Sequence, residues 1–202
     1  MFTGIITNIG TVRARDETGE MRFTISCAYA HESINMGASI ACSGTCLTVV
    51  DKGFTPEWGN WFAVEASQET LRLTTLGTWH VGTRINLERA LCLGDELGGH
   101  LVTGHVDGIG TVSGKEMIGD SMGLSITLPE SLMPYVAQKG SLCVDGVSLT
   151  VNSIGKVSSN LNIIPHTIHA TTLGTLEIGD EVNLEIDLIA RYLQRILEQR
   201  KE

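Results

Sequence analysis

The sequence predicts an all-β protein made of two similar antiparallel barrels, followed by one C-terminal α-helix. Three observations lead to this prediction. Short motifs occur twice along the chain, each half contains five or six strand patterns separated by glycine turns, and a helical period appears only at the end. Glycine is plentiful, with 23 residues, which suits a fold that has many tight turns.

The internal repeat is clearest at residues 44–49, which return as residues 146–151. Other echoes keep the same order. Thr3-Gly4 returns as Thr103-Gly104, and residues 74–77 return as residues 171–174. Each repeat is about 97 residues long, which is enough for one small hydrophobic core.

Within each repeat, β-branched and aromatic residues form short runs bounded by turn residues, as in barrel strands. Ser43-Gly44 and Asp145-Gly146 predict tight hairpin turns at matching places. Short helices are expected after Ser67, a suitable N-cap, and around residues 129–137. The predicted strands are residues 2–12, 22–27, 39–42, 46–50, 61–66 and 84–90, then 104–112, 124–128, 142–144, 147–151, 161–164 and 181–186.

The repeat also predicts the domain organisation. We expect an N-terminal barrel at residues 1–97, a C-terminal barrel at residues 98–187 and a helix at residues 188–202. Apolar residues in the tail recur at helical spacing with polar residues between them, so the helix is amphipathic. It either folds back on its own domain or bundles with copies of itself as an oligomerisation element.

Composition argues against several kinds of partner. The net charge is −9 with few basic clusters, which argues against nucleic acid and against an anionic membrane surface. No apolar run reaches the roughly 18 residues of a membrane span. Residues 1–4 already begin the repeated pattern, so no signal peptide is expected. The five irregularly spaced cysteines predict reduced thiols and a cytoplasmic location.

Polar residues at matching positions of the repeats are candidates for a functional site. Cys46 and Thr48 match Ser148 and Thr150, and alternate residues of a strand face one side. Duplicated folding constraints also fit this pattern, because threonine is common in strands. His105 stands where the first repeat has isoleucine, and histidine can move protons near neutral pH. Further matched pairs are Thr70 and Thr167, Glu88 and Glu185, and Ser39 and Ser141.

No common metal or nucleotide signature is present. Cys42 and Cys46 straddle a predicted hairpin turn and no second cysteine pair follows, so a zinc site is not expected. Gly108-Ile109-Gly110 is not followed by a helix pattern, which argues against a dinucleotide loop.

The motifs taken together point to a known family. They are residues 1–6, the Gly-x-Cys-Leu-Thr-Val element at residues 44–49, Glu69-Thr70-Leu71, residues 98–106, residues 145–151 and the two Thr-Thr-Leu-Gly runs. In these motifs the chain resembles the riboflavin synthase family over its whole length, tail helix included. The resemblance implies two six-stranded Greek-key barrels in each subunit and a C-terminal helix that drives trimer formation.

The resemblance also implies a reaction. A transferase of this family converts two molecules of 6,7-dimethyl-8-ribityllumazine into riboflavin and 5-amino-6-ribitylamino-uracil by moving a four-carbon unit, the last step of riboflavin biosynthesis. It implies no metal or redox cofactor, a site between barrels of neighbouring subunits of a homotrimer, and lumazine synthase as a candidate partner. The alternative is a non-catalytic lumazine or flavin carrier (an antenna protein). The enzyme is favoured because both barrels keep their polar residues.

Carried over by residue, the resemblance implies catalytic roles for Cys46, His105, Ser148 and Thr150, with Asp145 as an orienting carboxylate. The first-barrel substrate site is expected to contain Gly4, Ile5, Ile6, Ser39, Cys46, Leu47, Thr48, Glu65, Ala66, Ser67, Gln68, Glu69 and Thr70. The second is expected to contain Gly104, His105, Val106, Lys139, Ser148, Leu149, Thr150, Ile163, Ile164, Pro165, His166, Thr167 and Ile168. Thr45, His166 and a local insertion with Trp58 and Trp61, expected near the first-barrel site, depart from the family's usual pattern.

Overall fold

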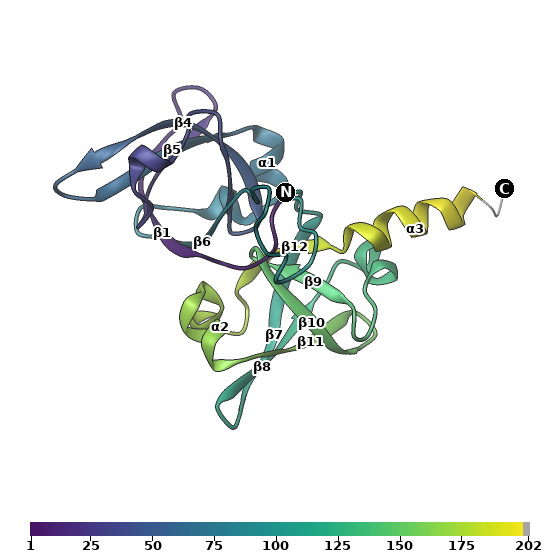
Figure 1. The fold of residues 1–202 in the computed structure, drawn as a ribbon. Coiled ribbons are helices and arrows are strands. Elements are labelled where there is room, and N and C mark those ends of the chain that lie inside the picture. The colour runs from purple at the N-terminus through teal and green to yellow at the C-terminus, as the bar shows by residue number, and fades with distance from the viewer. Residues whose placement is uncertain (200–202) are drawn as a thin grey trace.

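The computed structural model describes residues 1–199 and has the predicted class, with two antiparallel barrels and a C-terminal helix (Figure 1). The first barrel consists of β1 (Asn8–Asp16), β2 (Met21–Ser26), β3 (Ser39–Cys42), β4 (Thr45–Thr55), β5 (Gly59–Ala66) and β6 (Arg84–Arg89). The second consists of β7 (Gly108–Ile118), β8 (Ser121–Thr127), β9 (Ser141–Val144), β10 (Val147–Ile154), β11 (Ser158–Ile163) and β12 (Glu181–Ile186).

Both barrels close with the same strand order. The first runs β1-β2-β5-β4-β3-β6, and β6 pairs back with β1. The second runs β7-β8-β11-β10-β9-β12, and β12 pairs back with β7. This Greek-key order leaves each strand with a neighbour on both sides, so neither barrel has an open edge.

Alternation of apolar and polar residues gives each barrel its own core. In β2, for example, Met21, Phe23 and Ile25 point inward while the residues between them are half-buried. Each fully buried side chain of this size contributes about 1.5–3 kcal/mol. The largest buried side chains include Phe23, Phe62 and Leu87 in the first barrel and Met122, Leu124 and Ile126 in the second.

The two predicted hairpin turns are present. Ser43-Gly44 joins β3 to β4 with φ of 42° and 83°, and Asp145-Gly146 joins β9 to β10 with φ of 45° and 81°. Positive φ at both central residues is the geometry of a type I′ turn, whose twist matches the strands it joins. The turns meet where the barrels touch: a Cβ on Gly44 would lie 2.8 Å from the amide nitrogen of Gly146.

Two buried asparagines lock the barrels together. Asn86 of β6 donates to the carbonyl of Asp145 at 2.9 Å, and Asn183 of β12 donates to the carbonyl of Ser43 at 2.8 Å. Their side-chain oxygens accept at 2.8 Å from the amides of Thr172 and Thr75 of the opposite repeat. Both asparagines are at most 1% exposed, so these exchanged bonds fix the relative position of the repeats.

The first strand of each barrel begins later than predicted. β1 starts at residue 8 rather than 2, and β7 at 108 rather than 104. Gly4 and Gly104 interrupt the strand with φ of 77° and 80°, a conformation that favours glycine. The preceding residues leave their own barrel, and Phe2 pairs with Val102 instead. We call residues 2–6 and 102–106 the crossing segments.

The short helices were predicted in part. α1 (Gln68–Leu73) follows Ser67, whose hydroxyl accepts from the amide of Thr70 at 3.2 Å, as expected for an N-cap. Residues 130–135 form a 3₁₀-helix after Pro129. The sequence analysis missed α2 (Pro165–Ala170), which occupies the place of α1 in the second repeat. It also missed three 3₁₀ turns, at residues 31–33, 75–78 and 172–175.

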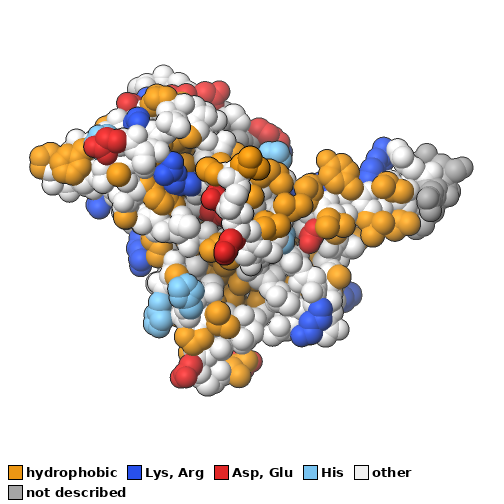
Figure 2. Space-filling view, viewed as in Figure 1, with side chains coloured by type: hydrophobic (Ala, Val, Ile, Leu, Met, Phe, Trp, Pro, Cys, Tyr) orange, Lys and Arg blue, Asp and Glu red, His pale blue; other side chains and the backbone are white. Residues whose placement is uncertain are grey.

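The C-terminal helix α3 (Leu188–Gln199) projects from the second barrel (Figure 1). Its apolar side chains run along the projecting arm (Figure 2), with Ile189 69%, Tyr192 63% and Leu193 55% exposed. The helix therefore does not fold back on its own domain. The last residues of the predicted helix, 200–202, lie outside the described part of the chain. No helix within residues 1–199 is long and apolar enough to span a membrane.

Candidate active site

The two crossing segments are held by matching buried carboxylates. Glu88 accepts from the amide and hydroxyl of Thr3 at 2.7 Å and from the amide of Gly4 at 2.9 Å. Glu185 makes the same three bonds with Thr103 and Gly104, at 2.7, 2.7 and 2.8 Å. Burial raises the pKa of both carboxyls, and the hydrogen bonds oppose this shift. Glu88 and Glu185 therefore position the backbone.

Each crossing segment lies on the barrel of the other repeat. The carbonyl of Gly4 accepts from the amide of Ser148 at 2.8 Å, and the carbonyl of Gly104 accepts from the amide of Cys46 at 2.9 Å. A Cβ on Gly4 would lie 2.5 Å from the Cβ of Ser148, and one on Gly104 would lie 2.5 Å from that of Cys46. Only glycine fits at these two contacts.

This crossing changes how the candidate residues are grouped. The sequence analysis placed residues 4–6 in the first-barrel site and residues 104–106 in the second-barrel site. In the structure, Gly4 lies instead against Ser148 of the second barrel, and Gly104 lies against Cys46 of the first barrel. We therefore define the Cys46 site as Cys46–Thr48, Glu65–Thr70 and Gly104–Val106, and the Ser148 site as Ser148–Thr150, residues 162–168 and Gly4–Ile6.

The strands of each site present their polar side chains on the outside of the barrel. Val49 pairs with Val64, which places Glu65 beside Thr48. Val151 pairs with Leu161, which places Asn162 beside Thr150. The candidates whose side chains are buried in the barrels can reach a ligand only through their backbone; they are Leu47, Ala66, Leu149 and Ile163.

The pairing shows that the second-barrel range began one residue late. Asn162 is the structural counterpart of Glu65, whereas the sequence analysis began the range at Ile163. The sequence carried the signal, because Thr70 and Thr167 match at the same offset as Glu65 and Asn162. Asn162 therefore joins the Ser148 site.

A histidine that the sequence analysis left without a role lies against Ser148. The Nδ1 atom of His100 lies 2.6 Å from the Ser148 hydroxyl. Burial lowers the pKa of His100, while the charge of Asp187 opposes this shift. A neutral imidazole in contact with a hydroxyl can accept its proton, so this is the geometry of an activated nucleophile or a proton relay. The sequence analysis included His100 in the family motif at residues 98–106 but gave it no catalytic or binding role.

The Cys46 site carries different groups. Cys46 is half-buried and His105 is exposed on the crossing segment that covers it. The amide of His105 donates to the hydroxyl of Thr103 at 3.3 Å, which helps to hold the segment in place. Burial raises the pKa of Cys42 and Cys143 well above the usual thiol range, so neither of these buried thiols is a nucleophile.

Two other predicted site residues, Ser39 and Lys139, lie at the edges of these sites, whereas a third, Asp145, lies elsewhere. Ser39 pairs with Thr48 across β3 and β4, so it borders the Cys46 site. Lys139 adopts φ of 67° and donates its amide to the carbonyl of Val151, near the Ser148 site. Asp145 makes a different contact: its carboxylate accepts from the amide of Asn183 at 2.8 Å at the junction of the barrels. This contact makes Asp145 part of the barrel junction.

The tryptophans of the insertion lie away from the site. Trp58 occupies the turn between β4 and β5, at the opposite end of that hairpin from Cys46. Trp61 packs its ring on Gly53 across the same hairpin. The expectation that this insertion borders the first-barrel site was wrong, because β4 extends to Thr55 and carries the turn outward.

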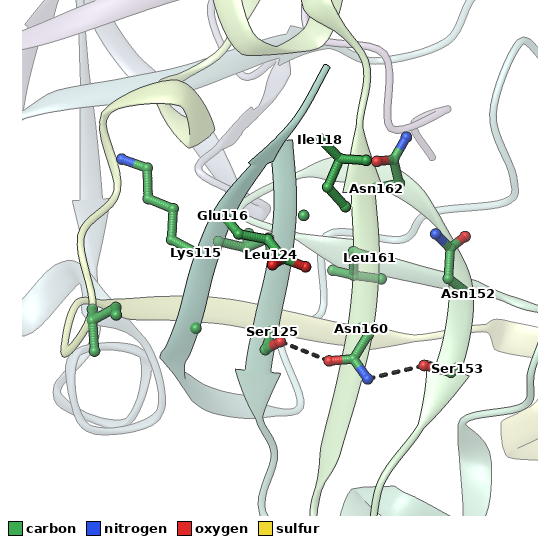
Figure 3. A pocket seen from close by; sticks show the side chains of 13 residues that line it. Lys115, Glu116, Ile118, Leu124, Ser125, Asn152, Ser153, Asn160, Leu161 and Asn162 are labelled. Atoms are coloured by element: carbon green, nitrogen blue, oxygen red, sulfur yellow. Dashed lines mark hydrogen bonds between the residues drawn. The ribbon is translucent and has the colours of Figure 1, made fainter. Parts of the chain in front are cut away.

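A polar hollow of about 610 Å³ borders the Ser148 site on the outer face of the second barrel (Figure 3). Asn160 accepts from Ser125 at 2.6 Å and donates to Ser153 at 2.9 Å, forming a chain across its floor. Asn152 and Asn162, which flank Thr150, line the side nearest the site. In the first barrel, Arg22 stands where the second has Gly123, and its guanidinium pairs with the Asp51 carboxylate at 2.7 Å.

Comparison with known proteins agrees with this duplicated arrangement. The lumazine binding domain family matches twice, at residues 3–90 and 103–187. A riboflavin synthase of Brucella abortus (strain 2308) is 49% identical over the full length of both chains. The chain belongs to the riboflavin synthase family.

Proteins of lower identity are also similar over most of the chain. The riboflavin synthase of Bacillus subtilis (strain 168) is 38% identical, covering all of this chain and 92% of the relative. Among solved structures, LumP complexed with riboflavin superposes with a TM-score of 0.82 at 27% identity, covering 92% of this chain and 99% of LumP. The family repeat thus corresponds to one barrel with its crossing segment.

Proposed function

We propose that this protein is a riboflavin synthase, a transferase that converts two molecules of 6,7-dimethyl-8-ribityllumazine into riboflavin and 5-amino-6-ribitylamino-uracil. One lumazine donates a four-carbon unit to the other. The observation that carries the proposal is the pair of sites with matching frameworks and different reactive groups, in a chain 49% identical over its full length to a riboflavin synthase. Two identical substrates that meet different fates require this combination.

The matching frameworks hold the two substrates. Backbone groups of the crossing segments and of the outer strands bind the ring systems, and hydroxyl, amide and carboxylate side chains bind the ribityl chains. These side chains are Thr48, Glu65 and Thr70 in the Cys46 site and Thr150, Asn162 and Thr167 in the Ser148 site. Holding two rings face to face supplies a large part of the rate, because proximity alone is worth about 7–11 kcal/mol.

The different groups carry the proton transfers. In the Ser148 site, neutral His100 accepts a proton from the Ser148 hydroxyl as it adds to the bound ring. In the Cys46 site, Cys46 and His105 flank the second ring and move protons to and from its 7-methyl carbon. The Asp145 carboxylate acts on the barrel junction rather than on either ring.

The functional unit is a homotrimer assembled through α3. The apolar face of this helix is exposed in the single chain, and burying it against two copies removes Ile189, Tyr192 and Leu193 from water. In the trimer the Cys46 site of one subunit faces the Ser148 site of its neighbour. Deleting residues 188–202 should give monomers that bind lumazine with sharply reduced turnover; a fully active monomer would contradict this arrangement.

The protein works in the cytoplasm, where its five free thiols stay reduced. The domains are the barrels at residues 1–97 and 98–187 and a C-terminal oligomerisation segment at residues 188–202, which contains α3. Lumazine synthase is a candidate partner, and the association can be tested by co-sedimentation of the two purified proteins.

The decisive experiment uses purified protein and 6,7-dimethyl-8-ribityllumazine alone. Riboflavin should form, seen by its absorbance and fluorescence, together with an equal amount of the pyrimidine product and without added metal or nucleotide. Binding without turnover would refute the enzyme and leave the carrier. A Cys46→Ala variant should bind the substrate and turn it over more slowly.

A further inference from the structure

The start of α3 is tied to the crossing segment over Cys46. Asp187, directly after β12, caps the helix by accepting from the amide of Ile189 at 2.8 Å. One turn later, Arg191 forms a bidentate pair with Asp107: Nη1 lies 2.7 Å from Oδ1, and Nη2 lies 2.8 Å from Oδ2. Two parallel charge-assisted bonds fix the direction of the guanidinium group.

Asp107 is itself firmly placed. Its carboxylate also accepts from the amide of Ile186 at 2.9 Å, and its own amide donates to the carbonyl of Leu184 at 2.7 Å. The Asp107 side chain is only 11% exposed and that of Arg191 38%, so the pair is less screened by water than a surface pair. Asp107 thus joins α3 to the last strand of the barrel.

The same residue continues the crossing segment. Asp107 follows His105 by two residues, and the segment's Gly104 carbonyl accepts from the amide of Cys46. The bidentate pair therefore links the direction of α3 to the Asp107 carboxylate, and two peptide units join Asp107 to His105. The other arginine within the described part of α3, Arg195, makes only a 3.7 Å contact with Glu198 of the same helix.

We propose that Arg191 is a positioning residue whose pair with Asp107 couples the direction of α3 to the placement of His105 over Cys46. The inference rests on the proposed function for the roles of His105 and of α3. Assembly through α3 then does more than bring subunits together, because it also sets the geometry of the Cys46 site inside each subunit.

The test compares Arg191→Gln with Arg195→Gln, which removes the same charge one turn further along the same helix. Arg191→Gln should lower kcat about tenfold with a smaller change in KM, since a displaced catalytic group slows the chemical step. It should also shift the side-chain NMR signal of His105 while the protein remains a trimer in sedimentation. Arg195→Gln should change neither quantity. Arg191→Lys, which keeps the charge but loses the second bond, should lie between the two.

Two results would overturn the proposal. One is a wild-type kcat and an unchanged His105 signal in Arg191→Gln. The other is a loss of activity that follows the fraction of dissociated subunits and disappears at high protein concentration, which would make Arg191 an assembly contact. If the wild-type protein shows no turnover, the proposed function fails, but the His105 signal of the two variants still tests the coupling.

Discussion

Replacing Asp145 with Asn is expected to stabilise the protein more at pH 8 than at pH 5. Asp145 lies at the barrel junction and is 7% exposed. Burial raises its pKa from 3.8 to about 7, and the hydrogen bond from Asn183 opposes this shift only in part. Asparagine keeps the acceptor oxygen for Asn183 and tolerates the φ of 45° at this position.

The direction of this pH dependence follows from how tightly Asp145 binds its proton in the folded and unfolded states. Because the folded-state pKa is raised, the folded protein holds the proton more tightly than the unfolded chain. The stability that protonated Asp145 contributes is fully present below about pH 3.8 and is lost as the pH rises through about 7. A difference of about three pKa units corresponds to about 4 kcal/mol, of which about 2–3 kcal/mol falls between pH 5 and pH 8. The Asp145→Asn variant has no carboxyl group at this position, so its free energy of unfolding does not decrease for this reason.

The assay is urea unfolding of wild type and variant at both pH values and at one protein concentration, because assembly also contributes to stability. Asp145→Ser, which copies Ser43 at the matching turn, should show the same pH dependence. Asp120→Asn, in the exposed turn between β7 and β8, serves as the control and should change the free energy of unfolding equally at both values. An Asp145→Asn effect that is equal at pH 5 and pH 8 would refute the reasoning.

Three further predictions concern the sites. His100→Ala should lower kcat by roughly 10²-fold with little effect on substrate affinity, because Ser148 loses its proton acceptor; near-normal turnover would contradict the relay. Gly4→Ala should destabilise the protein by about 1–3 kcal/mol more than Gly37→Ala, measured by thermal unfolding, because both have positive φ but only the first would clash. Glu185→Gln should cost about 1–3 kcal/mol, since one donor of the crossing segment then faces an amide group; unchanged stability would argue against its anchoring role.

The sequence was sufficient for the parts of the fold that rest on local chemistry. The turn dipeptides, the Ser67 cap and the alternation of strands depend on neighbouring residues, and the structure has them all. The repeats supplied the rest of the prediction, because a second copy of each motif distinguishes a barrel from a chance pattern. The Greek-key order of six strands in each barrel followed from the family resemblance.

Contacts between residues that are far apart in the sequence could not be predicted. Gly4 and Ser148 touch across most of the length of the chain, and nothing local to either residue indicates that the crossing segments exchange. His100 was missed for the same reason, because its partner Ser148 lies 48 residues further along the chain. Buried asparagines such as Asn86 look like ordinary strand polar residues until the opposite repeat is placed beside them.

The exchange of crossing segments bears on how such a chain could arise. A single repeat cannot complete its own site, because the carbonyl of Gly4 or Gly104 accepts its hydrogen bond from a strand of the other repeat. Two identical single-repeat chains could satisfy each other by swapping these segments, as in a symmetric domain-swapped dimer. Fusing the two copies into one gene would keep the exchange of crossing segments. The two repeats would then no longer need the same sequence. One repeat could carry the imidazole of His100 beside Ser148, and the other could carry the thiol of Cys46.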